Sequence, residues 1–154
     1  GSMYVTAHFH FTLMGAGLTG AIASLVYWFP KMTGRMLDKK LSWISFWFVQ
    51  VGFNVAFIGM FFVGLQGQPR RVEAYAAIFN KGNLITSIGA AAIMTGMLVL
   101  LAAVIGSWRG GVKAPMNPWQ AKSLEWTVPN PVPLENFATL PIVTEDVYGY
   151  GRKN

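Results

Sequence analysis

Three long stretches of the chain contain no Asp, Glu, Lys or Arg. They are Tyr4–Phe29, Leu41–Leu65 and Leu84–Trp108. Each is longer than the roughly 20 apolar residues that cross a bilayer as a helix. None has the polar face that a helix of this length shows in a soluble domain. The pattern therefore predicts three transmembrane helices and an all-α membrane protein.

The character of the chain changes after the third stretch. No later run is apolar enough to cross a membrane, and the segment is rich in proline, glycine and polar residues. We therefore expect a membrane part over residues 1–108 and an irregular tail over residues 109–154 on the inner membrane surface. Within the membrane part, we expect helices over about residues 3–30, 41–66 and 83–108.

The composition supports a membrane protein and excludes several other classes. Of the 154 residues, 53% are hydrophobic and 12% are charged, against about 25% charged in soluble domains. The chain has no cysteine, which excludes disulfides, thiolate metal sites and c-type haem attached through a C-x-x-C-H motif. The net charge of +6 would suit nucleic acid, but the basic residues lie in short loops between apolar stretches. We expect a lipid bilayer as the partner and no nucleic acid.

The charges of the loops predict the orientation. The loop after the first stretch carries four basic residues against Asp38: Lys31, Arg35, Lys39 and Lys40. The segment directly after the third stretch carries Arg109, Lys113 and Lys122. By the positive-inside rule these segments face the cytoplasm, or the matrix of a mitochondrion. The amino terminus then lies on the outer side, and we expect the bacterial cytoplasmic membrane, with the mitochondrial inner membrane as the alternative.

The sequence Ala7–Phe11, AHFHF, contains both histidines of the chain, His8 and His10. On a regular helix two such side chains diverge by about 200°, so they cannot hold the same ion. Each could simply bond a neighbouring helix, which is worth about 0.6–2 kcal/mol. However, ionisable groups inside membrane helices are rare and usually functional, and imidazole is a common axial ligand of haem iron. Two histidines on opposite flanks favour cofactor binding.

A pair of arginines lies in the second loop, within the sequence GQPRR at Gly67–Arg71. The predicted orientation puts Arg70 and Arg71 on the outer side, where the positive-inside rule expects few basic residues. A solvated turn around Pro69 is one interpretation. The other is an anion clamp, because guanidinium groups bind carboxylates in a bidentate manner. Haem propionates are such carboxylates, and the two histidines lie on the same side.

Other polar and small residues lie within the stretches. Gln50 and Asn54 are four residues apart and share a helix face. We expect them to bond a neighbouring helix, with a water chain for protons as the alternative. Several glycines are expected to permit close helix packing or close approach to a haem: Gly15, Gly17, Gly20 and Gly89.

Several motifs together resemble the carboxy-terminal part of subunit I of the haem-copper oxidases, the cytochrome c oxidase group. Tyr4–Phe11, YVTAHFHF, is similar to the histidine motif on the tenth helix of that family. Trp28–Pro30 (WFP) resembles the end of that helix, and Gly52–Asn54 (GFN) resembles part of the eleventh. Val63–Arg71, VGLQGQPRR, is similar to the arginine loop, and Leu124–Trp126 (LEW) to the tail.

The resemblance implies a role for each candidate site residue. It makes His8 the axial ligand of a high-spin haem, where oxygen is reduced beside a copper ion. It makes His10 an axial ligand of a low-spin haem, with Phe9 between the two haems. Arg70 and Arg71 would contact the propionates. The implied cofactors are two haems, expected to be a-type, and a copper ion whose ligands lie outside this chain.

The resemblance also implies a larger assembly. The three helices would be part of a bundle of about twelve helices, in the catalytic subunit of a terminal respiratory oxidase. This enzyme reduces dioxygen to water with electrons from cytochrome c or quinol and couples the reaction to proton translocation. The implied partners are the remainder of subunit I, subunits II and III and the electron donor. We expect an excerpt of a longer subunit, inactive by itself, with a split-gene product as the alternative.

The chain departs from the family pattern at four positions. Gly1 stands where many members have an Asp of a magnesium site, so no ligand is implied there. Phe61 replaces a common His, Phe11 a common Tyr and Gln68 a common Met. Two other classes remain open from the residues alone: a cytochrome b-like electron-transfer protein, and a structural subunit whose histidines only bond neighbours.

Overall fold

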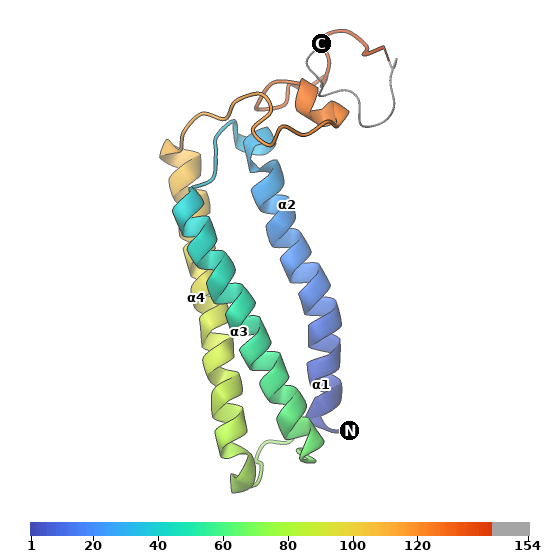
Figure 1. The fold of residues 1–154 in the computed structure, drawn as a ribbon, viewed down its shortest axis with the longest axis vertical. Coiled ribbons are helices and arrows are strands. Elements are labelled where there is room, and N and C mark those ends of the chain that lie inside the picture. Colours follow the sequence, from blue (N-terminus) through green and yellow to red (C-terminus); the bar gives the residue numbers. More distant parts are fainter. Residues whose placement is uncertain (143–154) are drawn as a thin grey trace. The chain divides into compact units, whose positions relative to one another are not determined.

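The computed structural model describes residues 1–142 and consists mainly of three long helices (Figure 1). The first helix is continuous and contains α1, Met3–Phe9, a π-helical turn, His10–Met14, and α2, Gly15–Thr33. The other two are α3, Lys39–Leu65, and α4, Asn80–Gly110. Short 3-10 turns precede α4 and occur in the tail, at Ala77–Phe79 and Leu124–Thr127.

All three helices are long and apolar enough to cross a membrane. Within residues 1–142 there is no β-strand, only the isolated bridges Ser2–Pro69 and Arg35–Lys113. The predicted all-helical protein with three candidate membrane spans is therefore confirmed. The boundary at residue 108 and the inner-surface position of the tail stay predictions, and residues 143–154 of that tail lie outside the described part.

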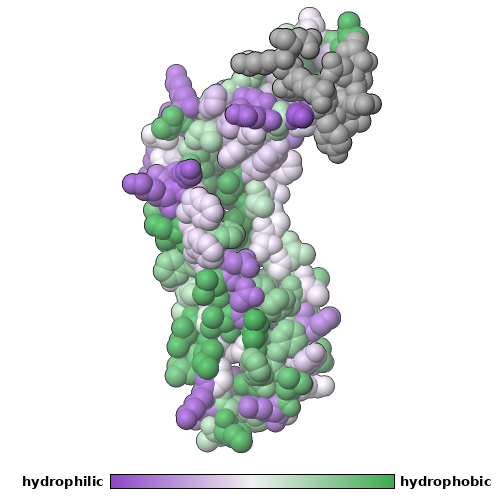
Figure 2. Space-filling view, in the orientation of Figure 1, coloured by the Kyte–Doolittle hydropathy of each residue, from purple (hydrophilic) through white to green (hydrophobic). Residues whose placement is uncertain are grey.

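The chain divides into two compact units. Unit 1 contains Gly1–Ala23 and Lys39–Ala103, and unit 2 contains Ser24–Asp38 and the chain from Val104 onward. Figure 2 shows apolar side chains over much of the helical surface in view. Large apolar side chains such as Trp47 are exposed along α3 and α4. Such surfaces are typical of helices that contact lipid or further membrane helices.

The core of unit 1 lies where the π-helical turn of the first helix and α4 pack against α3. Its buried members are Phe53, Ala56 and Phe57 of α3, with Ile93 of α4. Four partly buried side chains pack against this cluster: Phe11, Met14, Met60 and Met97. The aromatic residues of α3 thus serve helix packing on one side, while others remain exposed on the rest of the helix.

Small residues determine how closely α3 and α4 approach. A Cβ atom added at Gly52 would lie 2.7 Å from the carbonyl oxygen of Gly89 and 2.8 Å from the amide nitrogen of Ile93. A Cβ at Gly96 would lie 2.7 Å from Cγ2 of Val49. Membrane helices commonly use small residues in this way. The close packing expected at Gly89 is therefore confirmed.

The glycines of the first helix differ from one another. A Cβ added at Gly15 would lie 3.2 Å from the Phe53 ring, so this glycine faces α3. Within the described part of the chain, a Cβ at Gly17 or Gly20 would meet nothing within 4 Å. This part of the helix therefore has an open surface that a neighbouring group could approach closely.

In unit 2 the tail is fixed to the end of α2 by aromatic side chains. The indole of Trp126, which is 1% exposed, donates to the Tyr27 hydroxyl at 2.7 Å. The indole of Trp119 donates to the Tyr27 carbonyl at 2.9 Å. Trp28 donates to Oε2 of Glu125 at 3.0 Å. The LEW motif therefore anchors the tail on the last turns of α2.

Lys31 extends this anchor and is itself 7% exposed. Its Nζ donates to the Val128 carbonyl at 2.7 Å and lies 4.8 Å from the centroid of the Trp126 ring. Its own carbonyl accepts from the Val132 amide at 3.1 Å. A cation in the last turn of a helix also interacts favourably with the helix dipole. Lys31 therefore connects the helix end to two parts of the tail.

Replacing Lys31 with alanine should loosen the tail. The variant loses a charged hydrogen bond, worth about 1.5–3 kcal/mol, and a cation–π contact. We expect hydrogen exchange of the tail amides around Trp126 to accelerate by about tenfold or more, since 1.4 kcal/mol is a factor of ten. Lys40→Ala, which removes an exposed lysine, is the matched control. Equal exchange in both variants would contradict the anchoring role of Lys31.

Candidate functional site

The two histidines lie at the junction of α1 and the π-helical turn and have different surroundings. His8 is exposed, whereas His10 is half-buried. The ring of His10 stacks on Phe57 of α3, with centroids 5.0 Å apart and planes at 18°. The two imidazoles therefore have separate environments, one against α3 and one open, as expected for positions two residues apart on a helix.

The π-helical turn beginning at His10 is a feature that sequence reasoning missed. It spans His10–Met14, and the Thr12 hydroxyl lies 3.2 Å from the carbonyl oxygens of both His8 and Phe9. Single π-turns inside α-helices are rare and frequently occur at functional sites. A threonine that bonds back to the preceding turn is the only local signal, and it is a weak one.

A hydrogen bond determines which nitrogen of His10 is available. Its Nδ1 lies 2.8 Å from the Thr6 carbonyl oxygen. Because a carbonyl oxygen can only accept, Nδ1 carries the hydrogen, and in the neutral ring Nε2 keeps its lone pair. Metal-binding histidines commonly donate their other N–H to a backbone carbonyl in this way. His10 therefore has the chemistry of an axial haem ligand.

Phe9 lies between the two histidines in the chain and is 38% exposed. Its ring centroid lies 4.4 Å from that of His10, at an interplanar angle of 31°. His8 and Phe9 are both exposed, and they follow each other in the chain, so their side chains leave the helix about 100° apart. An apolar ring in this position can contact groups held on either side of the helix.

The arginine loop is held against the first residues of the chain. The Arg70 amide donates to the Gly1 carbonyl at 3.0 Å, and the Met3 amide donates to the Gln68 carbonyl at 2.9 Å. The loop therefore lies at the amino-terminal end of α1. His8 lies about 7–8 Å further along that helix from Met3, at 1.5 Å per residue. The structure thus brings the histidine and arginine motifs to the same end of unit 1.

The two arginines have different backbone conformations. Arg70 is half-buried, and Arg71 is exposed with a φ of +63°. A non-glycine residue with positive φ is uncommon. Such conformations persist where the surrounding structure fixes them, and they cluster at ligand-binding sites. The loop therefore has a fixed backbone conformation and carries two successive guanidinium groups.

Gln68 is a second feature that sequence reasoning did not place in the site. Its side chain is 4% exposed. Nδ2 of Asn83 donates to Oε1 of Gln68 at 3.0 Å, and Nε2 of Gln68 donates to Oδ1 of Asn83 at 3.4 Å. Asn83 lies in the first turns of α4. This amide pair connects the arginine loop to α4.

Two departures from the family pattern, Phe11 and Phe61, lie together. Their ring centroids are 5.8 Å apart. Phe61 also contacts Tyr4 at 4.8 Å, and Phe11 contacts Phe53 at 4.9 Å. The aromatic contacts fill the space between the first helix and α3. Phe11 and Phe61 therefore share one location between the first helix and α3.

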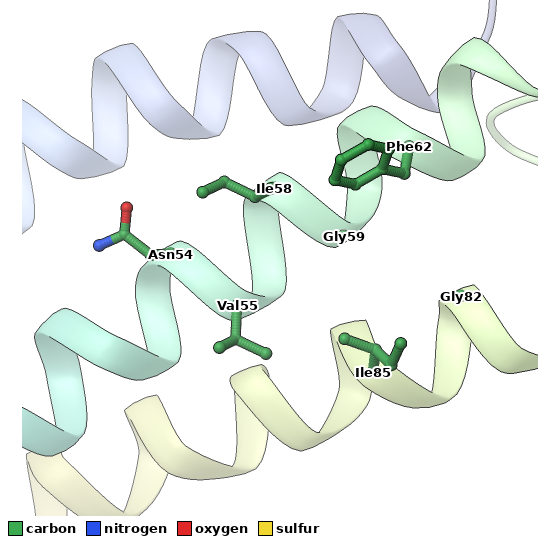
Figure 3. A pocket seen from close by; sticks show the side chains of 7 residues that line it. All are labelled: Asn54, Val55, Ile58, Gly59, Phe62, Gly82 and Ile85. Carbon is green, nitrogen blue, oxygen red and sulfur yellow. The ribbon is translucent and has the colours of Figure 1, made fainter.

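An apolar groove of about 440 Å³ lies between α3 and α4 (Figure 3). Its lining consists of Asn54, Val55, Ile58, Gly59, Phe62, Gly82 and Ile85. Asn54 is the only lining residue with a polar side chain, and its Nδ2 donates to the Gln50 carbonyl of the same helix at 2.8 Å. The expected bond from Asn54 to a neighbouring helix is therefore replaced by one within α3. The groove offers packing surface and no titratable group.

The candidate metal ligands of the site are the two separate histidines, His8 and His10. Among residues 1–142, no three or more His, Cys, Asp or Glu side chains lie close enough together to hold a metal ion. A haem iron needs only one axial nitrogen from a given helix, because the porphyrin supplies four ligands of its own. The separate imidazoles of His8 and His10 are compatible with that requirement.

Comparison with known proteins gives a consistent result. Residues 1–92 match the family described as cytochrome c and quinol oxidase polypeptide I. The chain is 43% identical over 148 residues to cytochrome c oxidase subunit 1 of Thermostichus vulcanus, covering 96% of this chain and 27% of that protein. It is 39% identical over 145 residues to the corresponding subunit of Bacillus sp. (strain PS3), covering 92% and 24%. The chain thus spans about a quarter of the length of these curated relatives.

Proposed function

Because the chain belongs to the family of cytochrome c and quinol oxidase polypeptide I, we propose that it supplies one axial ligand to each of two haems in a terminal respiratory oxidase. His10 would hold the low-spin haem and His8 the high-spin haem. The observation that carries this proposal is the bond from His10 Nδ1 to the Thr6 carbonyl, 2.8 Å long. It leaves Nε2 of His10 as a ligand, while His8 is exposed in a different environment.

Each residue of the site would have its own role in holding the haems. When bound, the haems supply electron transfer and, with a copper ion held by ligands outside this chain, the reduction of dioxygen. The Thr6 carbonyl fixes the tautomer and the ring orientation of His10. Phe9 contacts His10 at 4.4 Å and would fill the apolar space between the two haems. Arg70 and Arg71 would bind the propionates, because guanidinium matches carboxylate geometry.

The activity of the whole enzyme follows from the same proposal. It would reduce dioxygen to water with electrons from cytochrome c or quinol, and couple this reaction to proton translocation. The remainder of subunit I would supply the copper ligands and the proton channels, and the other oxidase subunits would assemble with it. The haems would be of the a-type, as the resemblance implies.

We also propose a membrane orientation. Arg35 lies between α2 and α3, Lys39 and Lys40 begin α3, and Lys113 and Lys122 follow α4. Positive residues of this kind favour the cytoplasmic or matrix side. The arginine loop, which is held against the start of α1, would then lie on the outer side. This orientation would direct the propionates of both haems toward the outer face.

The test is a carbon monoxide difference spectrum of the complete subunit in reduced membranes. We expect a shifted band for only part of the haem, because one haem would have an open face and the other two axial ligands. No carbon monoxide response in the presence of reducible haem would indicate a cytochrome b-like electron-transfer protein. No haem absorption at all would leave a structural subunit. Either of these results would contradict the proposal.

A further inference from the structure

Gln68 lies where the ends of three helices, α1, α3 and α4, meet. Its amide donates to the Val63 carbonyl in the last turn of α3 at 3.1 Å. Its carbonyl accepts from the Met3 amide at the start of α1 at 2.9 Å. Its side chain pairs with Asn83 in the first turns of α4. Every polar group of Gln68 thus connects the arginine loop to one of the long helices.

We propose that the Gln68–Asn83 amide pair is a positioning device for Arg70 and Arg71, and that it thereby sets the reduction potential of the low-spin haem. This inference rests on the proposed function, in which the arginines bind the haem propionates. Gln68 does not itself touch the haem in this proposal. It acts through Pro69, the single residue that separates it from Arg70.

The short connection explains why the amide pair can control the arginines. Only Pro69 lies between Gln68 and Arg70, and proline fixes its own φ and restricts the residue before it. The Arg70 amide is held by the Gly1 carbonyl at 3.0 Å. Arg71 then adopts a φ of +63°, which needs support from its surroundings. A shift of the Gln68 side chain is therefore transmitted to both guanidinium groups.

Burial makes the pair a strong constraint. Gln68 is 4% exposed, and a buried amide without a partner costs about 1–3 kcal/mol. The two amides satisfy each other reciprocally, so the loop is held in the one register in which both bonds form. Methionine has a similar volume but neither donates nor accepts strongly. It therefore removes the constraint without emptying the site.

The test is Gln68→Met in the complete, haem-loaded oxidase, with a redox titration of the low-spin haem as the readout. Displaced guanidinium groups stabilise the reduced haem less, so its midpoint potential should fall. We expect about a tenfold change in the reduction equilibrium constant, which is about 59 mV for a one-electron couple. Gln66→Met is the matched control, because it makes the same substitution at an exposed glutamine two residues earlier. Its potential should equal that of the parent.

Further variants separate positioning from general damage. Asn83→Leu should lower the potential as much as Gln68→Met, and the double variant no further, because both remove the same interaction. When Arg70 and Arg71 are both glutamine, Gln68→Met should have no additional effect. Should Gln68→Met fail to bind haem, Asn83→Ser carries the same test. Faster hydrogen exchange of the Arg70 amide should accompany the shift.

The outcome that overturns the inference is an unchanged potential in Gln68→Met and Asn83→Leu proteins with full haem content. An equal effect of Gln68→Met in the presence and absence of the two arginines would overturn it as well. Failure of the proposed function looks different. In that case the low-spin haem would survive replacement of His10, whatever the potentials of the Gln68 variants.

Discussion

Replacement of His10 by alanine should remove the low-spin haem from the complete oxidase and leave the carbon monoxide-binding haem in place. The lone pair on Nε2, fixed by the Nδ1 bond to Thr6, disappears with the side chain. A methyl group cannot ligate iron, and the ring stacked on Phe57 is lost as well. Reduced-minus-oxidised spectra and total haem content measure the effect. The haem content should fall by about half, and electron transfer to oxygen should stop, because the low-spin haem that would pass electrons to the oxygen-binding haem is absent.

The variant His8→Ala tests whether each histidine binds a different haem. His8→Ala should remove the carbon monoxide response and spare the low-spin spectrum, because His8 has an environment separate from that of His10. Phe57→Leu is the matched control, since it removes the ring stacked on His10 without removing a ligand. This control should keep both haems. If both histidine variants retained both haems, the assignment of the two ligands would be wrong.

The three spans were predictable because charge is excluded from the bilayer core, so the charge-free stretches mark them directly. The helix ends were less predictable. The first helix continues through Pro30 to Thr33, past the expected end near residue 30. The end of that helix carries Lys31, whose ammonium group is buried against Trp126 and bonded to Val128. Contacts with a segment almost 100 residues later therefore support a helix end that local sequence alone would not extend.

Residue type and spacing identified the candidate ligands and the arginine pair, because few side chains can bind haem or propionates. The sequence did not indicate how the arginine loop is attached to the helix that carries the histidines. The arginine loop meets the start of α1 through backbone bonds of Gly1 and Met3, and backbone groups are the same in every residue. The Gln68–Asn83 pair was missed for a related reason. Nothing in the sequence indicates that a glutamine in a loop and an asparagine 15 residues later in a helix form a hydrogen bond. The π-helical turn at His10 had only Thr12 as a local indication.

The role of the glycines could be assigned only in part from the sequence. Every glycine in a membrane helix permits close packing. Whether another helix packs closely there depends on the position of that neighbouring helix. Gly89 and Gly52 face each other across α3 and α4, whereas Gly106 of α4 has nothing within 4 Å of an added Cβ in the described structure. Two glycines of the same helix should therefore respond in opposite ways to the same substitution.

Gly89→Ala should destabilise the packed helices, and Gly89→Leu should prevent stable assembly of the subunit. An added Cβ would press on the Ala56 backbone and lie 2.8 Å from the Gly52 carbonyl oxygen. Backbone atoms cannot move aside as a flexible side chain can, so α3 and α4 must separate. Overpacking of this kind costs about 1–3 kcal/mol for a small group and more for a large one. Retention of haem during heating of the purified complete subunit measures the loss.

Gly106→Ala is the matched control, because its change in stability should have the opposite sign to that of Gly89→Ala. In a helix interior alanine is favoured over glycine by about 0.5–1 kcal/mol, and at Gly106 nothing in the described structure opposes this gain. This variant should therefore be at least as stable as the parent, while Gly89→Ala is less stable. If Gly89→Ala matched Gly106→Ala, contact between the α3 and α4 backbones would not limit stability. Opposite shifts would instead establish that this backbone contact carries part of the stability of unit 1.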